Sequence, residues 1–146
     1  DYTDLALALD SVRRRWPGAE VVATCVTGGR PDMALSVLGL LAGYKGAPVW
    51  IAEDEITARI LHGGESWAIE GAEGKTFSII AIAPNTEVSE HGLEWELDHS
   101  PLGLLADTGI SNIVRSTAKI EVHTGTAIAY LLHQGFIGTA DKNNRS

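Results

Sequence analysis

The sequence is poor in cysteine and in positive charge, and both shortages narrow what the protein can do. Cys25 is the single cysteine in 146 residues, which excludes a disulfide framework and a cysteine-based zinc site. Lys and Arg number 11 against 19 Asp and Glu, so the formal net charge is −8. Because phosphate backbones are bound by clustered Lys and Arg, this balance argues against nucleic acid as a partner.

Long apolar runs are missing as well. No stretch approaches the roughly 20 apolar residues that span a bilayer, so we expect no membrane contact and a cytoplasmic protein. Hydrophobic residues nevertheless make up 45% of the chain and charged residues 21%, which is a globular composition with enough apolar side chains for a core. An acidic globular protein suits cationic ligands, or anions bridged by metal ions.

The first third of the chain alternates between helical and strand patterns. Apolar residues recur at helical spacing over residues 5–16. Residues 20–26 form a near-continuous apolar run, typical of a strand buried on both faces, in which Cys25 is inert packing. A largely buried helix over residues 31–44 and a strand over 49–52 complete a βαβ unit.

The hydrophobic period changes to two after residue 53. Short alternating segments separated by Gly- and Pro-containing turns, with no helix between them, indicate an antiparallel sandwich or barrel. We expect a turn at residues 98–101, and for Trp95 packing in the sheet, with a place in a ligand site as the alternative. The predicted strands are 56–60, 67–69, 77–79, 93–97, 120–122 and 126–132.

The predicted fold class is therefore an α/β remnant, the βαβ part of a parallel sheet, followed by an antiparallel β-sandwich domain. The domains are residues 1–53 and 54–146. A sheet of two parallel strands is too small to be stable by itself, because parallel sheets need several strands and cover on both faces. We therefore expect the chain to be the C-terminal part of a longer protein.

Two motifs in the α/β part have the residue types of a metal and phosphate site. Asp1, Thr3 and Asp4 stand at a helix start, where they either cap the helix or ligate Mg²⁺. Gly28-Gly29-Arg30-Pro31-Asp32 joins the predicted strand to the next helix, at the sheet edge where α/β folds bind ligands. It is either a plain turn with a surface Arg or a phosphate cradle.

A third motif lies in the β part. Residues 107–112 join two predicted strands with small polar groups, either as a plain loop or as a pocket rim in which Ser111 and Asn112 hold a heterocycle. The histidines show no metal-ligand spacing, so we interpret them as ordinary surface or hydrogen-bonded residues.

Taken in order, these motifs resemble the thiamine pyrophosphokinase (thiamine diphosphokinase) family. They are Asp-x-Thr-Asp at a helix start, Gly-Gly-Arg-x-Asp after a strand, Gly-Leu-x-Trp-x-Leu in a sheet, and Ser-Asn in a late loop. The resemblance covers nearly the whole chain, from Asp1 to about Leu132. It implies an α/β nucleotide-binding catalytic domain followed by a thiamine-binding β-sandwich domain.

The resemblance also implies a reaction and a division of roles. The family transfers a pyrophosphoryl group from ATP to the thiamine hydroxyl, giving thiamine diphosphate and AMP, and its members are homodimers with shared active sites. Phosphoryl-type transfer depends on positioning and charge neutralisation, which acidic residues with Mg²⁺ and an Arg supply. The implied assignments are catalysis to Asp4, Arg30 and Asp32, nucleotide binding to Asp1, Thr3, Gly28, Gly29 and Arg30, metal binding to Asp1, Asp4 and Asp32, and thiamine binding to Ser111 and Asn112.

The chain departs from the family pattern at two places. The Gly-Asp-x-Asp-Ser motif, a main metal-binding element of the family, has no counterpart, so the fragment is expected to lack part of the catalytic site. Met33 stands where bacterial relatives often have His. Two other functions remain open: a non-catalytic module that binds thiamine or its diphosphate, and a related pyrophosphokinase acting on another hydroxylated heterocycle.

Overall fold

The structure, a computed structural model, describes residues 2–133 and is mostly β-sheet with few helices. None of its helices is long and apolar enough to cross a membrane, within those residues. The helices are α1 (Asp4–Arg15) and α2 (Pro31–Ala42). The strands are β1 (Val21–Ala23), β2 (Val49–Ala52), β3 (Ile56–His62), β4 (Ser66–Ile69), β5 (Thr76–Ala81), β6 (Thr86–Leu93), β7 (Leu97–Leu102), β8 (Asn112–Thr124) and β9 (Thr126–Leu132).

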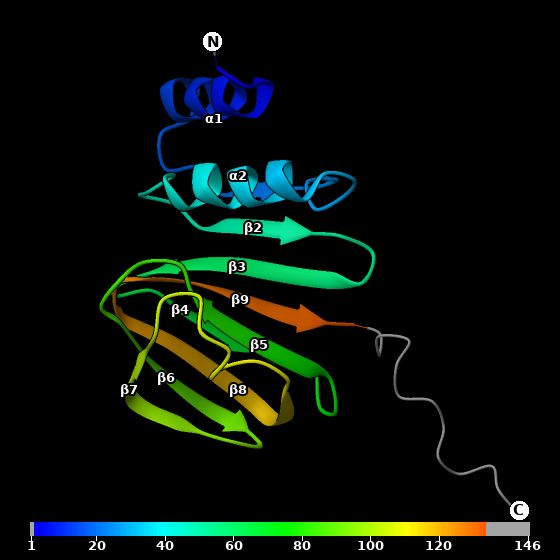
Figure 1. Cartoon of the computed structure of the whole chain (residues 1–146), viewed down its shortest axis with the longest axis vertical. Coiled ribbons are helices and arrows are strands. Elements are labelled where there is room, and N and C mark those ends of the chain that lie inside the picture. The colour runs from blue at the N-terminus through cyan, green and yellow to red at the C-terminus, as the bar shows by residue number, and fades with distance from the viewer. Residues whose placement is uncertain (1, 134–146) are drawn as a thin grey trace, which may run out of the picture.

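The strands form one mixed sheet in the order β1-β2-β3-β9-β5-β8-β6-β7, with β4 paired to β8. β1 and β2 are parallel and are connected through α2, whereas the other pairings between these strands are antiparallel. β2 also pairs antiparallel with β3, so the sheet runs without a break from the helical end into the β half. Figure 1 shows α1 and α2 at that end, with α1 outermost.

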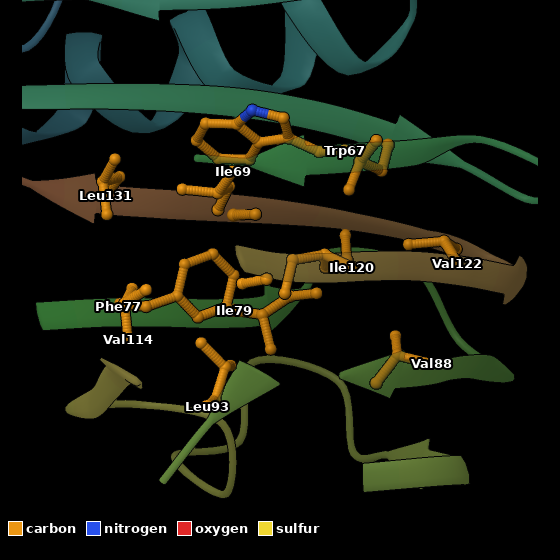
Figure 2. Close-up of a cluster of buried hydrophobic side chains, with 14 of the residues drawn as sticks. Trp67, Ile69, Phe77, Ile79, Val88, Leu93, Val114, Ile120, Val122 and Leu131 are labelled. Atoms are coloured by element: carbon orange, nitrogen blue, oxygen red, sulfur yellow. The ribbon is translucent and has the colours of Figure 1, made fainter. Parts of the chain in front are cut away.

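The β half folds back on itself around a hydrophobic core. Long strand β8 begins beside β5 at Phe77↔Asn112 and then pairs with β6 and β4, so it belongs to both layers of a sandwich-like arrangement. Figure 2 shows the side chains that fill the space between the layers, among them Trp67, Phe77 and Ile120. Because successive side chains of a strand point to opposite faces, these inward-pointing residues produce the alternation of apolar and polar residues from which the β half was predicted.

A second core joins the helices to the β half. Leu9 from α1, Leu41 from α2 and Ile51 from β2 pack with Ile60 from β3 and Ile128 from β9. Strands β3 and β9 thus contribute side chains to both cores. Two expectations stay predictions. One is that β1, α2 and β2 are part of a larger parallel sheet, and the other is that residues 1–53 and 54–146 are separate domains.

Several expectations for the α/β part were wrong. The strand predicted over residues 20–26 is limited to Val21–Ala23, and Cys25 is exposed in a loop with a left-handed φ of 57° rather than buried. The helix predicted to be largely buried leaves Met33 and Leu35 exposed. The short strand and the exposed helix have the same cause. β1 is the last strand of the sheet and pairs with β2 alone among the described strands, so few residues pack against β1 or against the outer face of α2.

The predicted strand over residues 93–97 was also wrong. β6 ends at Leu93 and β7 begins at Leu97, while Trp95 is exposed in the connection between them. The turn expected at residues 98–101 lies inside β7, which is an edge strand and therefore tolerates Pro101. Strand β6 itself was not predicted, because several of its buried positions are polar: Thr86, Ser89 and Glu90.

Candidate functional site

A small pocket of about 90 Å³ opens where the β6–β7 connection meets the start of β8. Its wall includes Trp95 and Leu97 from the β6–β7 connection and the start of β7, and Thr108, Gly109 and Ile110 from the loop before β8. Glu90 and Asn112 also line it. The pocket therefore combines an aromatic face with a few convergent polar groups, which is how sites for small heterocycles are built.

Asn112 holds the two sides of the pocket together. Its side chain is 5% exposed, and its Nδ2 donates to the carbonyl oxygen of Trp95 at 2.6 Å. The Oδ1 atom accepts from the backbone N–H of Trp95 at 3.1 Å and from that of Ile113 at 2.9 Å. The amide thus fixes the loop that presents Trp95, and its hydrogen-bonding capacity is largely used within the protein.

Glu90 is the second buried polar group of the pocket. Its side chain is 1% exposed, and its Oε2 accepts a long hydrogen bond of 3.4 Å from Asn112 Nδ2, while Oε1 has no hydrogen-bond partner among the described residues. Burial raises the pKa of Glu90 to about 7, and the hydrogen bond from Asn112 opposes that rise. A carboxyl group that changes charge near neutral pH faces the pocket.

Ser111 and Trp95 are both exposed, and of the two only Trp95 lines the pocket. Ser111 has a left-handed φ of 61°, and its backbone N–H donates to Ser78 Oγ at 3.0 Å. Trp95 is 62% exposed, so much of its surface is accessible. Of the two residues singled out by the sequence, the structure therefore brings Asn112 against Trp95, whereas Ser111 precedes it in the chain and is not among the residues that line the pocket.

Sequence reasoning missed Glu90. The signal available was its position in a segment where Val88 and Leu93 point inward, but alternation alone does not distinguish a buried Glu from one at the surface. For Trp95, the alternative of a place in a ligand site agrees with the pocket geometry, whereas sheet packing does not.

The first predicted metal motif lies at the start of α1. Thr3 is the N-cap of this helix, with its Oγ1 accepting from Ala6 N at 3.3 Å, and Asp4 lies in the first turn. Asp1 lies outside the described residues. The capping interpretation thus accounts for Thr3.

The second predicted motif lies between β1 and α2. Gly28 and Gly29 form a tight turn, in which Arg30 N donates to Gly28 O at 3.0 Å and Gly29 has a φ of 79°. The Arg30 Nε donates to Asp32 Oδ1 at 3.1 Å, and a second guanidinium nitrogen donates to Oδ2. This pairing lowers the pKa of Asp32 and raises that of Arg30, so each neutralises the other at an exposed helix start.

The described residues do not by themselves form a metal centre. Among residues 2–133, no group of three or more His, Cys, Asp or Glu side chains is placed to hold an ion. The same sheet edge carries an acidic pocket that the sequence reasoning missed, lined by Thr27, Glu53, Asp54 and Glu55, in which Glu53 accepts from the Val26 N–H at 2.9 Å. The acidic run directly after β2 was the available signal.

Comparison with known proteins supports the resemblance that the motifs indicated. Residues 67–128 match the family described as thiamin pyrophosphokinase, vitamin B1 binding domain. This segment contains Glu90, Trp95, Ser111 and Asn112, and so the whole candidate pocket. No curated protein matches the chain.

Solved structures of thiamine pyrophosphokinases share the fold. The enzyme from Bacillus subtilis matches with a TM-score of 0.76 and 21% identity over 92% of this chain and 65% of its own. The enzyme from Geobacillus thermodenitrificans matches with a TM-score of 0.78 and 21% identity over 93% and 64%, respectively. The enzyme from Candida albicans matches with a TM-score of 0.66 and 13% identity over 79% and 44%.

The chain therefore spans 65% or less of the length of these three relatives. At such identities the structural likeness shows a common fold. Together with the matched segment, it confirms the resemblance to the thiamine pyrophosphokinase family.

Proposed function

We propose that the chain binds thiamine in the pocket formed by Glu90, Trp95 and Asn112, as part of a thiamine pyrophosphokinase. The observation that carries the proposal is the position of this pocket inside the segment that matches a vitamin B1 binding domain. The pocket joins an accessible indole, on which an aromatic ring stacks, to buried polar groups that orient the ring. Ser111 and Asn112 are the thiamine-binding pair in this proposal, in which Asn112 acts mainly by holding the Trp95 loop in place and Ser111 through its exposed hydroxyl.

The charge of the chain agrees with a cationic ligand. The thiazolium ring of thiamine carries a positive charge, and the formal net charge of the chain is −8. A negative surface potential attracts such a cation during its approach. The aminopyrimidine ring would then be held at the pocket, with the thiazolium and its hydroxyethyl arm toward the solvent side.

The proposed reaction is the transfer of a pyrophosphoryl group from ATP to the thiamine hydroxyl, giving thiamine diphosphate and AMP. Mg²⁺ would neutralise phosphate charge, with Asp1, Asp4 and Asp32 as its carboxylate ligands and Arg30 beside them. Thr3, Gly28 and Gly29 complete the proposed nucleotide site. This part of the proposal is supported by the motif resemblance alone, because the described residues form no metal centre of three or more ligands.

Titration calorimetry with thiamine tests the binding proposal. We expect thiamine to bind the protein without nucleotide, and Trp95→Ala to weaken the affinity about tenfold through loss of stacking. The matched control is Trp16→Ala, because Trp16 is also exposed but lies at the end of α1, outside the pocket. Equal affinity of both variants and the unchanged protein would contradict the assignment of the pocket.

An assay for AMP release separates the enzyme from the second candidate function, a non-catalytic thiamine-binding module. With Mg-ATP and thiamine, an enzyme forms AMP and thiamine diphosphate, whereas a module binds thiamine and forms neither. In a protein that is active, we expect Asp4→Ala or Asp32→Ala to lower turnover at least tenfold. Undiminished turnover in both variants would contradict the proposed metal site.

The proposal includes a homodimer with shared active sites. It is supported by an apolar cavity of about 390 Å³ between α2 and the β half, beside the exposed side chains of Leu35, Leu104 and Leu105. Such a surface is often covered by a partner. Sedimentation equilibrium tests this part: a protein that stays monomeric at micromolar concentration would contradict it.

A further inference from the structure

The thiamine pocket contains a carboxylate oxygen that the protein does not use. Glu90 lines the pocket, its side chain is 1% exposed, and its Oε1 has no hydrogen-bond partner among the described residues. The other oxygen accepts only a 3.4 Å contact from Asn112, at the outer limit for a hydrogen bond. The carboxyl group therefore makes one weak hydrogen bond, and its Oε1 can accept another.

Such an arrangement is unfavourable for folding alone. A buried carboxylate that is incompletely hydrogen-bonded loses its hydration without full replacement, which destabilises the fold. Because most buried polar groups in proteins are hydrogen-bonded, an unpaired oxygen that lines a pocket is available to a molecule that enters it, water or ligand.

The neighbouring polar groups limit the chemical groups that can bind to Glu90 Oε1. Asn112 is committed to the Trp95 backbone, to Ile113 and to Glu90, so it has little capacity left for a ligand. At pH 8, above its pKa of about 7, Glu90 is mostly ionised, and an ionised carboxylate only accepts hydrogen bonds, so its partner must be a donor such as an amino group.

We propose that Glu90 accepts a hydrogen bond from the exocyclic amino group of the bound pyrimidine, and so selects amino-substituted over oxo-substituted rings. This inference rests on the proposed thiamine function and names the group that determines specificity at the same pocket. An oxo-substituted ring places a carbonyl oxygen where the amino group was, opposite the acceptor on Glu90. Two acceptors facing each other in a buried site disfavour binding.

Competition at pH 8 between thiamine and oxythiamine, in which oxygen replaces the amino group, tests the selection while Glu90 is mostly ionised. We expect the unchanged protein to bind thiamine at least about tenfold more tightly, since a site built for a donor rejects an analogue that lacks it. In Glu90→Gln, the amide oxygen takes the place facing Asn112 and the amide nitrogen takes the free position. The preference should then fall to about one or reverse, because a donor now faces the ring.

Two further variants make the result specific. Glu90→Asp retains the carboxylate and should keep a preference for thiamine, with lower affinity. Glu73→Gln removes the same charge at an exposed position on the β4–β5 turn and should leave the preference unchanged. Thermal unfolding of each variant shows that it is folded.

The outcomes distinguish this inference from the proposed function. Equal binding of thiamine and oxythiamine by the unchanged protein, or an unchanged preference in Glu90→Gln, overturns the role of Glu90 while thiamine binding stands. No binding of thiamine by the unchanged protein overturns both. If Glu90→Gln does not fold, the preference of the unchanged protein and of Glu90→Asp decides.

Discussion

Glu90 makes the stability of the fold depend on pH. Burial raises its pKa from an ordinary 4.5 to about 7. Between these values the folded state binds more protons than the unfolded state, so this stabilising contribution is complete below pH 4.5 and is lost as pH rises through about 7. Because a tenfold change in proton affinity corresponds to about 1.4 kcal/mol, the loss is on the order of 3 kcal/mol.

The variant Glu90→Gln should therefore be more stable than the unchanged protein at pH 8 and differ little from it at pH 4.5. Urea unfolding at pH values from 4.5 to 8 measures this difference. The pKa of His99 is raised mainly by its hydrogen bond to Glu87, so its contribution to the stability of the fold also falls as pH rises. This contribution is the same in both proteins and cancels when they are compared. A difference that is constant with pH would show that Glu90 does not titrate as described.

Asn112→Ala should both destabilise the fold and weaken thiamine binding. The change removes the hydrogen bonds to both backbone groups of Trp95 and leaves Glu90 without its partner. We expect a loss of about 2–3 kcal/mol in the free energy of unfolding and at least about a tenfold loss in affinity as the Trp95 loop is released.

Denaturant unfolding and calorimetry measure the two effects of Asn112→Ala. Ser111→Ala is the neighbouring control, because that side chain is exposed and its backbone N–H bond to Ser78 does not depend on the hydroxyl. It should leave stability unchanged and weaken binding only through its own contact with the ligand. A stable Asn112→Ala variant with unchanged affinity would refute the role given to the amide.

At the residue scale, the sequence predicted the polar pair but not the rest of the pocket. Ser111 and Asn112 were singled out by the family resemblance, because the loop pattern alone left a plain loop and a pocket rim both open, and their role in thiamine binding stays a prediction. Glu90 was not singled out, because strand alternation says which positions point inward and not which buried carboxyl groups remain unpaired. The partner of Trp95 is likewise set by the fold, since Asn112 lies 17 positions further along the chain.

Among the secondary-structure elements, β6 approaches β8 closely beside the pocket, and Gly92 makes this possible. Gly92 has a φ of 80°, and a Cβ there would overlap the carbonyl oxygen of Thr117 and lie 2.9 Å from the Cα of Ala118. The pairing of β6 with β8 also shifts register between His91 and Leu93. A glycine is therefore required for β6 and β8 to approach each other.

Gly92→Ala should destabilise the protein by about 3 kcal/mol or more, because positive φ and a backbone overlap act together. Gly74→Ala is the matched control: Gly74 has a φ of 82°, but nothing lies within 4 Å of an added Cβ. It should cost only about 1 kcal/mol. Chemical denaturation compares the two, and equal losses would show that the close approach to β8 contributes nothing.

Apolar strands inside the sheet were predictable, whereas of the two edge strands β1 was predicted too long and β7 was not predicted. The segments over residues 49–52 and 126–132 were predicted with the observed bounds of β2 and β9. Both strands are apolar and lie inside the sheet, and β9 has buried residues on both faces because it borders both cores. β1 and β7 end the sheet on either side, so their sequences carry weaker burial constraints. Whether a strand lies at the end of the sheet depends on which strands pair with it, and the pattern of residues along the chain does not show that pairing.

For the molecule as a whole, β3 and β9 form a wall shared by two cores. Ile60 and Ile128 face the helical end, whereas Leu61 and Ala127 belong to the core of the β half. The single sheet that includes β2 and β3 makes this wall continuous. The hydrophobic period of the sequence changes at residue 53, where the helical end gives way to the β half. Apolar contacts nevertheless join residues on the two sides of this position.

The acidic character of the whole chain gives a prediction about ligand binding. A formal charge of −8 attracts the thiazolium cation over a range set by screening, which is about 30 Å at 0.01 M salt and 3 Å at 1 M. We expect the affinity for thiamine to fall about threefold between 0.02 and 0.5 M NaCl. The uncharged hydroxymethyl aminopyrimidine, which lacks the thiazolium, should show no such dependence at pH 8. Calorimetry across the salt series measures both, and parallel behaviour of the two ligands would show that the field of the chain does not assist binding.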